Sequence, residues 1–137
     1  MTIVTKTEID KLADLFEFHV AGHEALALTV LRKVAGRLDF RLKLQKASIQ
    51  LIDAAPSATP FAVLGFRRTK PFIFLEFYGA ADLDDARIVQ TIEYEGRPLH
   101  RIHIATPDDV TEDVVAWVVD SAVRYSSDER SPPSLRL

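Results

Sequence analysis

The chain has 137 residues, of which 47% are hydrophobic and 27% are charged, and it contains no cysteine. A chain of this length and balance is expected to fold as one globular domain without a metal or a disulfide. The missing cysteines exclude disulfides, cysteine nucleophiles and thiolate metal sites. The first residues lack the pattern of a signal peptide, and no apolar run is long enough to span a membrane. We therefore expect a cytoplasmic protein with no membrane partner.

The net charge of −3 disfavours non-specific binding to nucleic acid, but the charged residues are unevenly distributed. Residues 32–70 contain nine Lys and Arg residues and two Asp residues, so this segment carries a local charge of +7. Two interpretations stay open. Either the segment forms a basic surface for an anionic partner, or its charges line the solvent side of strands.

Residues 7–34 show the spacing of an amphipathic helix. Apolar residues recur at intervals of three and four, with one slip near Gly22. Gly22 either divides the segment into two helices or weakens a single one, and Gly36 is expected to end it. The N-terminal third is therefore predicted to be helical.

From Leu38 onward, apolar residues alternate with polar ones, which is typical of half-buried strands. Short polar connections at residues 69–71 and 96–98 predict two hairpins, and the run 72–79, apolar on both faces, should lie inside the sheet. The pair Gln45–Lys46 is a turn, a bulge or mid-strand, so about five or six strands are expected. The predicted strands cover residues 38–45, 47–53, 61–68, 72–79, 88–95 and 99–105.

The stretch 99–105, LHRIHIA, contains two histidines that alternation places on opposite faces of a strand. His100 is expected to point inward and His103 outward, together with Arg101. The two histidines therefore cannot bind one metal ion. Thr106 is a suitable N-cap for a C-terminal helix that carries an apolar stripe.

These elements predict an α+β fold. It consists of an N-terminal helical segment, about five or six mostly antiparallel strands, and a C-terminal helix packed on one face of the sheet. Residues 1–126 are expected to form a single domain. Residues 127–137 lack apolar periodicity and are expected to form a mobile C-terminal tail.

The sequence contains no strong signature of catalysis or metal binding. His19 and His23 are four residues apart and would share a helix face, but the glutamate of the metalloprotease motif does not follow His19. Neither a nucleophile elbow nor a glycine-rich phosphate loop is present. We therefore expect no catalytic residue, no metal and no cofactor.

Basic side chains on the predicted strands form a better candidate site. Guanidinium and ammonium groups that share a sheet face bind phosphate or carboxylate groups. An exposed aromatic ring, such as that of Tyr78 or Phe66, could stack on a base. The alternative is that the long basic side chains only cover the sheet with their alkyl stems. The residues concerned are Arg41, Lys43, Lys46, Ser48, Gln50, Arg67, Arg68, Arg101 and His103.

Several short motifs follow one another between residues 25 and 125. A Lys-x-x-Ile strand precedes Phe-Ala, an Arg-hydrophobic pair, a His-basic pair and a helix that begins with Asp-Asp and contains Trp. This order resembles an uncharacterised family of small bacterial domains of unknown function. The matching residues are Lys46, Ile49, Phe61, Ala62, Arg87, Ile88, His100, Arg101, Asp108, Asp109, Val110, Trp117 and Ala122.

The chain departs from the family pattern at two positions. Where family members carry Thr after the Lys and often Pro before the Arg, this chain has Ala47 and Ala86. Some similar domains are attached to nuclease-like parts of larger proteins. The resemblance implies a compact α+β module in a nucleic-acid setting, with no known reaction.

Together these observations predict a non-enzymatic module that binds a partner or an anionic ligand on a basic sheet face, with nucleic acid as one candidate. The residues predicted to bind are Lys46, Arg87, His100 and Arg101. One alternative is a small hydrolase in which His100 acts as general base and Glu93 or Asp53 orients it. Another alternative is a structural homodimer formed through the N-terminal helices.

Overall fold

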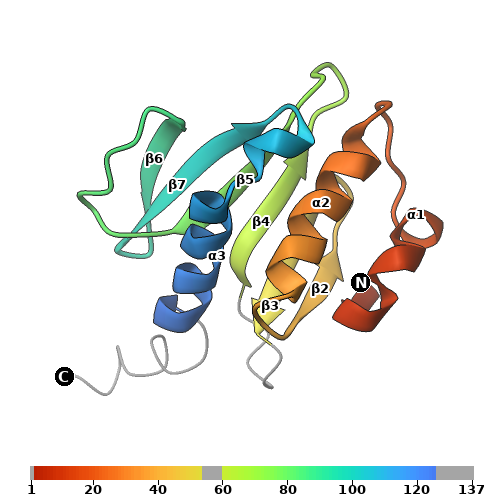
Figure 1. The fold of residues 1–137 in the computed structure, drawn as a ribbon, viewed down its shortest axis with the longest axis horizontal. Helices are drawn as coiled ribbons and strands as arrows, with labels where there is room; N and C mark the ends of the chain where they lie inside the picture. The colour runs from red at the N-terminus through yellow and green to blue at the C-terminus, as the bar shows by residue number, and fades with distance from the viewer. Residues whose placement is uncertain (1, 54–59, 126–137) are drawn as a thin grey trace.

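The computed structural model describes residues 2–53 and 60–125 and has a mixed α+β fold (Figure 1). Its seven strands form one antiparallel sheet with the order β1-β2-β3-β4-β5-β7-β6, which confirms the predicted fold class. The strands are β1 (Thr2–Thr5), β2 (Phe40–Leu44), β3 (Ser48–Asp53), β4 (Pro60–Phe66), β5 (Ile73–Tyr78), β6 (Ile88–Tyr94) and β7 (Arg97–Ile104). The helices are α1 (Leu12–Leu15), α2 (His23–Ala35) and α3 (Glu112–Tyr125), with short 3₁₀ helices η1 (Lys6–Lys11) and η2 (Pro107–Asp109).

The predicted number of strands is wrong, because the described part of the chain contains seven rather than five or six. Residues 45–47 form a turn in which the amide of Gln45 donates to the carbonyl of Ser48 at 2.9 Å, so β2 and β3 are separate strands. The additional strand is β1, which pairs with β2 and places Val4 opposite Leu42. A strand of four residues is too short to show a clear alternation in the sequence.

The N-terminal helical segment is divided before α2, which is one of the two alternatives predicted for Gly22, but the break already begins at Phe16. The chain becomes extended at Phe16, and the non-helical residues 16–22 lead to α2. Gly22 has a φ of 92°, a left-handed conformation that glycine adopts readily, directly before α2. The rings of Phe16 and Phe18 lie 5.1 and 5.4 Å from the ring of Phe66 in β4, between centroids. These tertiary contacts override the helical propensity of the segment.

Helices α2 and α3 lie on the same face of the sheet (Figure 1). The ring of Trp117 in α3 stacks on Phe77 in β5, with 5.4 Å between centroids. The buried hydroxyl of Ser121 donates to the carbonyl of Phe61 at 2.6 Å and accepts from the amide of Tyr78 at 3.0 Å. These bonds join α3 to β4 and β5 and satisfy two backbone groups that water does not reach.

We call the surface of the sheet opposite α2 and α3 the open face. Directly paired residues on neighbouring strands share a face, so one row of partly buried side chains crosses the open face from β2 to β7. Alternate positions on these strands are buried and belong to the hydrophobic core. The row consists of Lys43, Gln50, Val63, Glu76 and Arg101.

Strands β6 and β7 form a hairpin at one edge of the sheet. Glu95 and Gly96 between them have positive φ angles of 54° and 79°, and Tyr94 pairs directly with Arg97. Positive φ at both central residues defines a two-residue type I′ turn. The turn is therefore shorter than the predicted connection at residues 96–98 and begins one residue earlier.

Thr106 begins a helical turn, as predicted, but that turn is η2 and not α3. The carboxylate of Asp109 accepts hydrogen bonds from the amides of Ala105 and Thr106 at 2.8 and 3.0 Å. The hydroxyl of Thr111 then accepts from the amide of Val114 at 3.3 Å and caps α3.

Two further expectations concern the C-terminal tail and membrane spans. The predicted tail at residues 127–137 lies outside the described residues, as does the domain boundary at residue 126. Among the helices of the described residues, none has the length and apolar character needed to cross a membrane.

Candidate anion-binding site

Arg87, the first of the predicted binding residues, lies just before β6. Its guanidinium donates to both carboxylate oxygens of Asp85 at 2.8 Å and to the hydroxyl of Thr111 at 3.1 Å. It also lies 4.7 Å from the centre of the Trp117 ring. The hydrogen bonds from Arg87 lower the pKa of Asp85 to about 2, and those to Asp85 raise the pKa of Arg87. This guanidinium is therefore engaged within the protein.

His100 is buried, with a relative exposure of 1%. Its Nε2 lies 2.9 Å from the carbonyl of Ala80 and its Nδ1 lies 2.7 Å from the hydroxyl of Thr91. Because a carbonyl only accepts, Nε2 carries the proton and Thr91 donates to Nδ1. The predicted inward orientation of His100 is confirmed. Both ring nitrogens are occupied, so the geometry does not support a general base that receives a proton from a substrate.

Arg101 lies on the open face, where it is paired with an acid. Its Nη2 and Nε donate to Oε2 of Glu76 at 2.7 and 3.0 Å. Its guanidinium lies 4.3 Å from the centre of the Phe74 ring, and that of Arg67 lies 5.4 Å from the same centre. The Phe74 ring also covers Gly65, where an added Cβ would come within 2.0 Å of it. This ring is therefore enclosed by its neighbours.

Lys46 lies in the turn between β2 and β3 and is exposed. It forms no hydrogen bond or ion pair with any residue in the described part of the chain.

The four predicted binding residues lie on different surfaces. Arg87 and His100 contact residues on the helix-covered side, whereas Arg101 lies on the open face. The four predicted binding residues therefore do not converge on one surface.

Lys46 instead has cationic neighbours on a second turn. The amide of Phe66 donates to the carbonyl of Ala47 at 3.1 Å, which joins the β2–β3 turn to the start of the β4–β5 turn, residues 67–72. Cations gathered in one place strengthen the attraction for an anion. We call the exposed residues on these two turns the cationic end of the sheet: Lys46, Arg67, Arg68 and Lys70.

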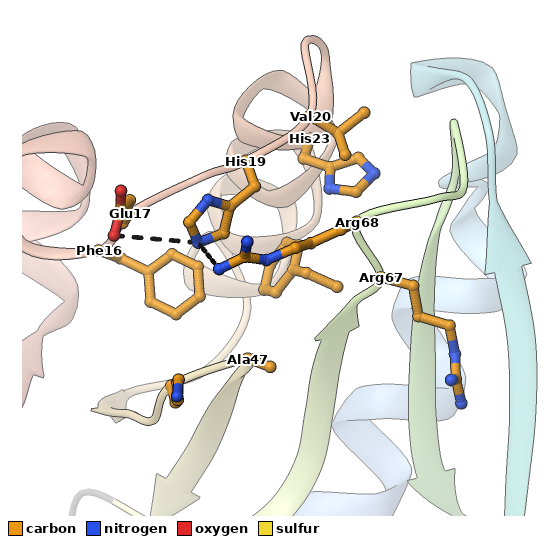
Figure 2. Close-up of a pocket in the computed structure, with 10 residues that line it drawn as sticks. Phe16, Glu17, His19, Val20, His23, Ala47, Arg67 and Arg68 are labelled. Atoms are coloured by element: carbon orange, nitrogen blue, oxygen red, sulfur yellow. Dashed lines mark hydrogen bonds and ion pairs between the residues drawn. The ribbon is translucent and has the colours of Figure 1, made fainter.

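A cavity of about 150 Å³ lies between the cationic end and residues 16–22 (Figure 2). The Phe66 ring is 5.1 Å from the Phe16 ring and 5.8 Å from the His23 ring between centroids. A cavity of this size can hold a group about as large as one aromatic ring. Its apolar lining comes from Phe16, Val20, Ala47 and Phe66, and its polar border from Glu17, His19, His23, Lys46, Arg67 and Arg68.

Arg68 points toward His19 beside the cavity, whereas Arg67 points away from both (Figure 2). Nη2 of Arg68 donates to Nε2 of His19 at 3.3 Å, so this nitrogen carries no proton. The carboxylate of Glu17 lies 3.9 Å from the same nitrogen. A guanidinium has five N–H donors, and this hydrogen bond occupies one of them.

The structure separates the two histidines that the sequence places on one helix face. His19 lies in the non-helical residues 16–22, whereas His23 is buried at the start of α2. Nε2 of His23 donates to the carbonyl of Lys70 at 2.8 Å, which ties α2 to the β4–β5 turn. Within the described ranges, no group of three or more His, Asp or Glu side chains could hold a metal ion.

His103 lies on the open face, close enough to Arg101 and to Lys70 of the cationic end to be affected by their charges. Its ring stacks on Phe72 with 4.1 Å between centroids, and it is exposed on the open face, as predicted. Burial lowers the pKa of His103, and the positive charges of Arg101 and Lys70 lower it further. His103 is therefore neutral near neutral pH and does not add to the positive charge that the Lys and Arg side chains of the cationic end present to an anion.

Sequence reasoning included Arg68 in a candidate cluster on a sheet face and Phe66 as a ring that could stack on a base. It did not select Phe16 or the pairing of Arg68 with His19. The local charge of +7 in residues 32–70 was the available signal for the cationic end. Nothing in the linear sequence indicates that residues 16–22 fold back beside these turns.

Comparison with known proteins provides no identification. No family model matches the chain, and searches of curated proteins and of solved structures found no match. The resemblance to a family of small bacterial domains therefore stays a prediction.

Proposed function

We propose that this chain is a non-enzymatic binding module that holds a small anionic ligand at the cationic end of the sheet. The supporting observation is that Lys46 and Arg68 border one cavity without a carboxylate partner among the described residues. Charge-assisted hydrogen bonds to a carboxylate or phosphate are stronger than bonds between neutral groups. An anion would therefore compete well with His19 for Arg68.

The packing of the aromatic rings on β4 and β5 favours a small anion over nucleic acid. Phe74 is enclosed by two guanidinium groups, and Phe66 packs against Phe16. Tyr78 is buried, with a relative exposure of 8%. Binding of single strands relies on exposed rings on which bases stack. Neither of the rings that the sequence offers for this role, Tyr78 and Phe66, is freely exposed.

The surroundings of His100 support a non-enzymatic role. Its two ring nitrogens bond Thr91 and Ala80, and neither bonds Glu93 or Asp53, the carboxylates considered for a hydrolase. A general base must lie within hydrogen-bond reach of the proton that it removes. A buried imidazole that already has two partners has no free nitrogen to meet a substrate.

The test is calorimetric titration with inorganic phosphate at about 0.1 M salt, on the wild type and on three charge-reversal variants. Lys46→Glu and Arg68→Glu are each expected to weaken binding about tenfold or more, since each replaces attraction with repulsion. Lys43→Glu is the matched control, because it changes the net charge equally but lies on the open face. It should change the affinity by no more than about twofold, because screening weakens charges beyond roughly 10 Å.

Two results would overturn the proposal. One is the absence of binding by phosphate and by carboxylates, and the other is equal weakening by all three variants. A short single-stranded oligothymidine is titrated in parallel. If it binds more tightly than phosphate, with log affinity falling by about 0.7 per phosphate contact per log unit of salt, nucleic acid replaces the small anion as the ligand.

A further inference from the structure

We infer that the ligand is a monocarboxylate that carries one aromatic ring or an aliphatic group of similar size. The ring enters the cavity, and the carboxylate binds Arg68 and Lys46. This inference rests on the proposed function and names the class of its ligand. It follows from the size of the cavity, from the charges beside it and from the geometry of Arg68.

The cavity explains why the ligand needs an apolar group. Phosphate or acetate would reach the cationic border and leave the walls formed by Phe16, Val20 and Phe66 without a partner. A volume of about 150 Å³ is close to that of an engineered protein cavity that binds benzene. Removing a ring from water into such a cavity strengthens binding in proportion to the apolar area buried.

The charges that border the cavity favour a single negative charge. Of the three cations that border the cavity, Arg67 points away from it toward the Phe74 ring (Figure 2). Lys46 and Arg68 therefore contribute two positive charges beside the cavity, and Glu17 contributes one negative charge. His19 takes part through its Nε2, which accepts the hydrogen bond from Arg68. The border therefore carries a net charge of about +1, which complements one carboxylate. A dianionic phosphate monoester would exceed it and would be repelled by Glu17.

The position of Arg68 fits a change of partner on binding. Its single bond of 3.3 Å to His19 is longer than the 2.7–2.9 Å typical of charge-assisted bonds. A carboxylate beside the cavity can take two parallel N–H bonds from the guanidinium. His19 would then exchange the hydrogen bond from Arg68 for water, since its side chain is partly exposed.

The experiment compares three probes by calorimetry at equal ionic strength: benzoate, acetate and benzyl alcohol. Benzoate is expected to bind about tenfold or more tightly than acetate, because burial of the ring adds to the charge interaction. Benzyl alcohol has the ring without the charge and should bind about tenfold or more weakly than benzoate, because it lacks the charge-assisted bonds.

Variants separate the two parts of the site. Val20→Phe and Ala47→Leu each fill the cavity, so benzoate affinity should fall to that of acetate while acetate affinity stays the same. Two positions are used because Ala47 is exposed in a turn and its variant should fold if the other does not. Arg68→Gln should weaken both anions, and Lys43→Gln, on the open face, should weaken neither.

The binding results distinguish a failure of the monocarboxylate inference from a failure of the proposed function. If benzoate and acetate bind equally, the monocarboxylate inference is overturned while the proposed function stands. If benzyl alcohol binds as tightly as benzoate, the carboxylate part of the inference is overturned. If acetate, benzoate and phosphate all fail to bind, the proposed function itself is overturned.

Discussion

Arg87 and Arg68 differ in what surrounds their guanidinium groups. Arg87 binds both oxygens of Asp85 at 2.8 Å and lies 4.7 Å from the centre of the Trp117 ring. Arg68 donates to the ring of His19 at 3.3 Å beside an apolar cavity. An arginine that is paired with a carboxylate inside the protein stabilises the fold, whereas one without a counter-ion can bind an external anion. The comparison distinguishes structural cations from binding cations.

The largest effect on stability is expected at His100, whose side chain, like that of Arg87, is bonded within the protein. His100→Ala removes a buried ring and leaves the carbonyl of Ala80 without its donor. The free energy of unfolding should fall by about 3 kcal/mol, measured by urea denaturation. His103→Ala, at an exposed position of the same strand, should cost about 1 kcal/mol or less. Equal losses for the two variants would contradict a structural role of His100.

Arg87→Met should have the next largest effect. The variant keeps most of the alkyl stem but loses the hydrogen bonds to Asp85 and Thr111 and the cation–π contact with Trp117. Because the Arg87 side chain is 38% exposed, water screens the pair, and we expect a loss of about 1 kcal/mol in urea denaturation. An unchanged midpoint would place Arg87 among the cations that are available for binding.

The pH dependence of stability should reveal the same ion pair. Arg87 lowers the pKa of folded Asp85 from its ordinary 3.8 to about 2, so the folded state favours the ionised carboxylate. This contribution is present above pH 4 and is lost as pH falls from about 4 to about 2. The difference in melting temperature between wild type and Asp85→Asn should therefore shrink over this range. A difference that grows on acidification would have the wrong sign.

The smallest effect on stability is expected at Arg68. Arg68→Met should change the free energy of unfolding by less than about 0.5 kcal/mol, because its partner His19 is exposed. The same variant should weaken phosphate binding about tenfold or more. A loss of stability as large as that of Arg87→Met would remove the distinction between the two arginines.

Local patterns in the sequence were sufficient for much of the fold but not for the site. Strict alternation placed His100 inward and His103 outward, because a strand reverses its side chains at each residue. The same alternation could not show that Arg87 forms an ion pair with Asp85, since two residues in a loop can adopt many geometries. It also could not reveal β1, whose four residues are placed by pairing with β2.

The cationic end depends on contacts between distant parts of the chain. Lys46 and Arg68 come together because β3 pairs with β4 and the turns at one end of these strands meet. Phe16 reaches the cavity because residues 16–22 leave the helical path that their spacing predicts. Such contacts require the register of the whole sheet, so the binding residues chosen from the sequence were distributed over several surfaces.

The most direct test of the central claim is a ¹H–¹⁵N NMR titration of the wild type with benzoate, which reports the location of binding. We predict that amide shifts concentrate at Val20, Ala47 and Arg68 and are small around Arg87 and Thr111. Shifts concentrated at Arg87 and Thr111, or no saturable shifts at all, would contradict the assignment of the cationic end as the binding site.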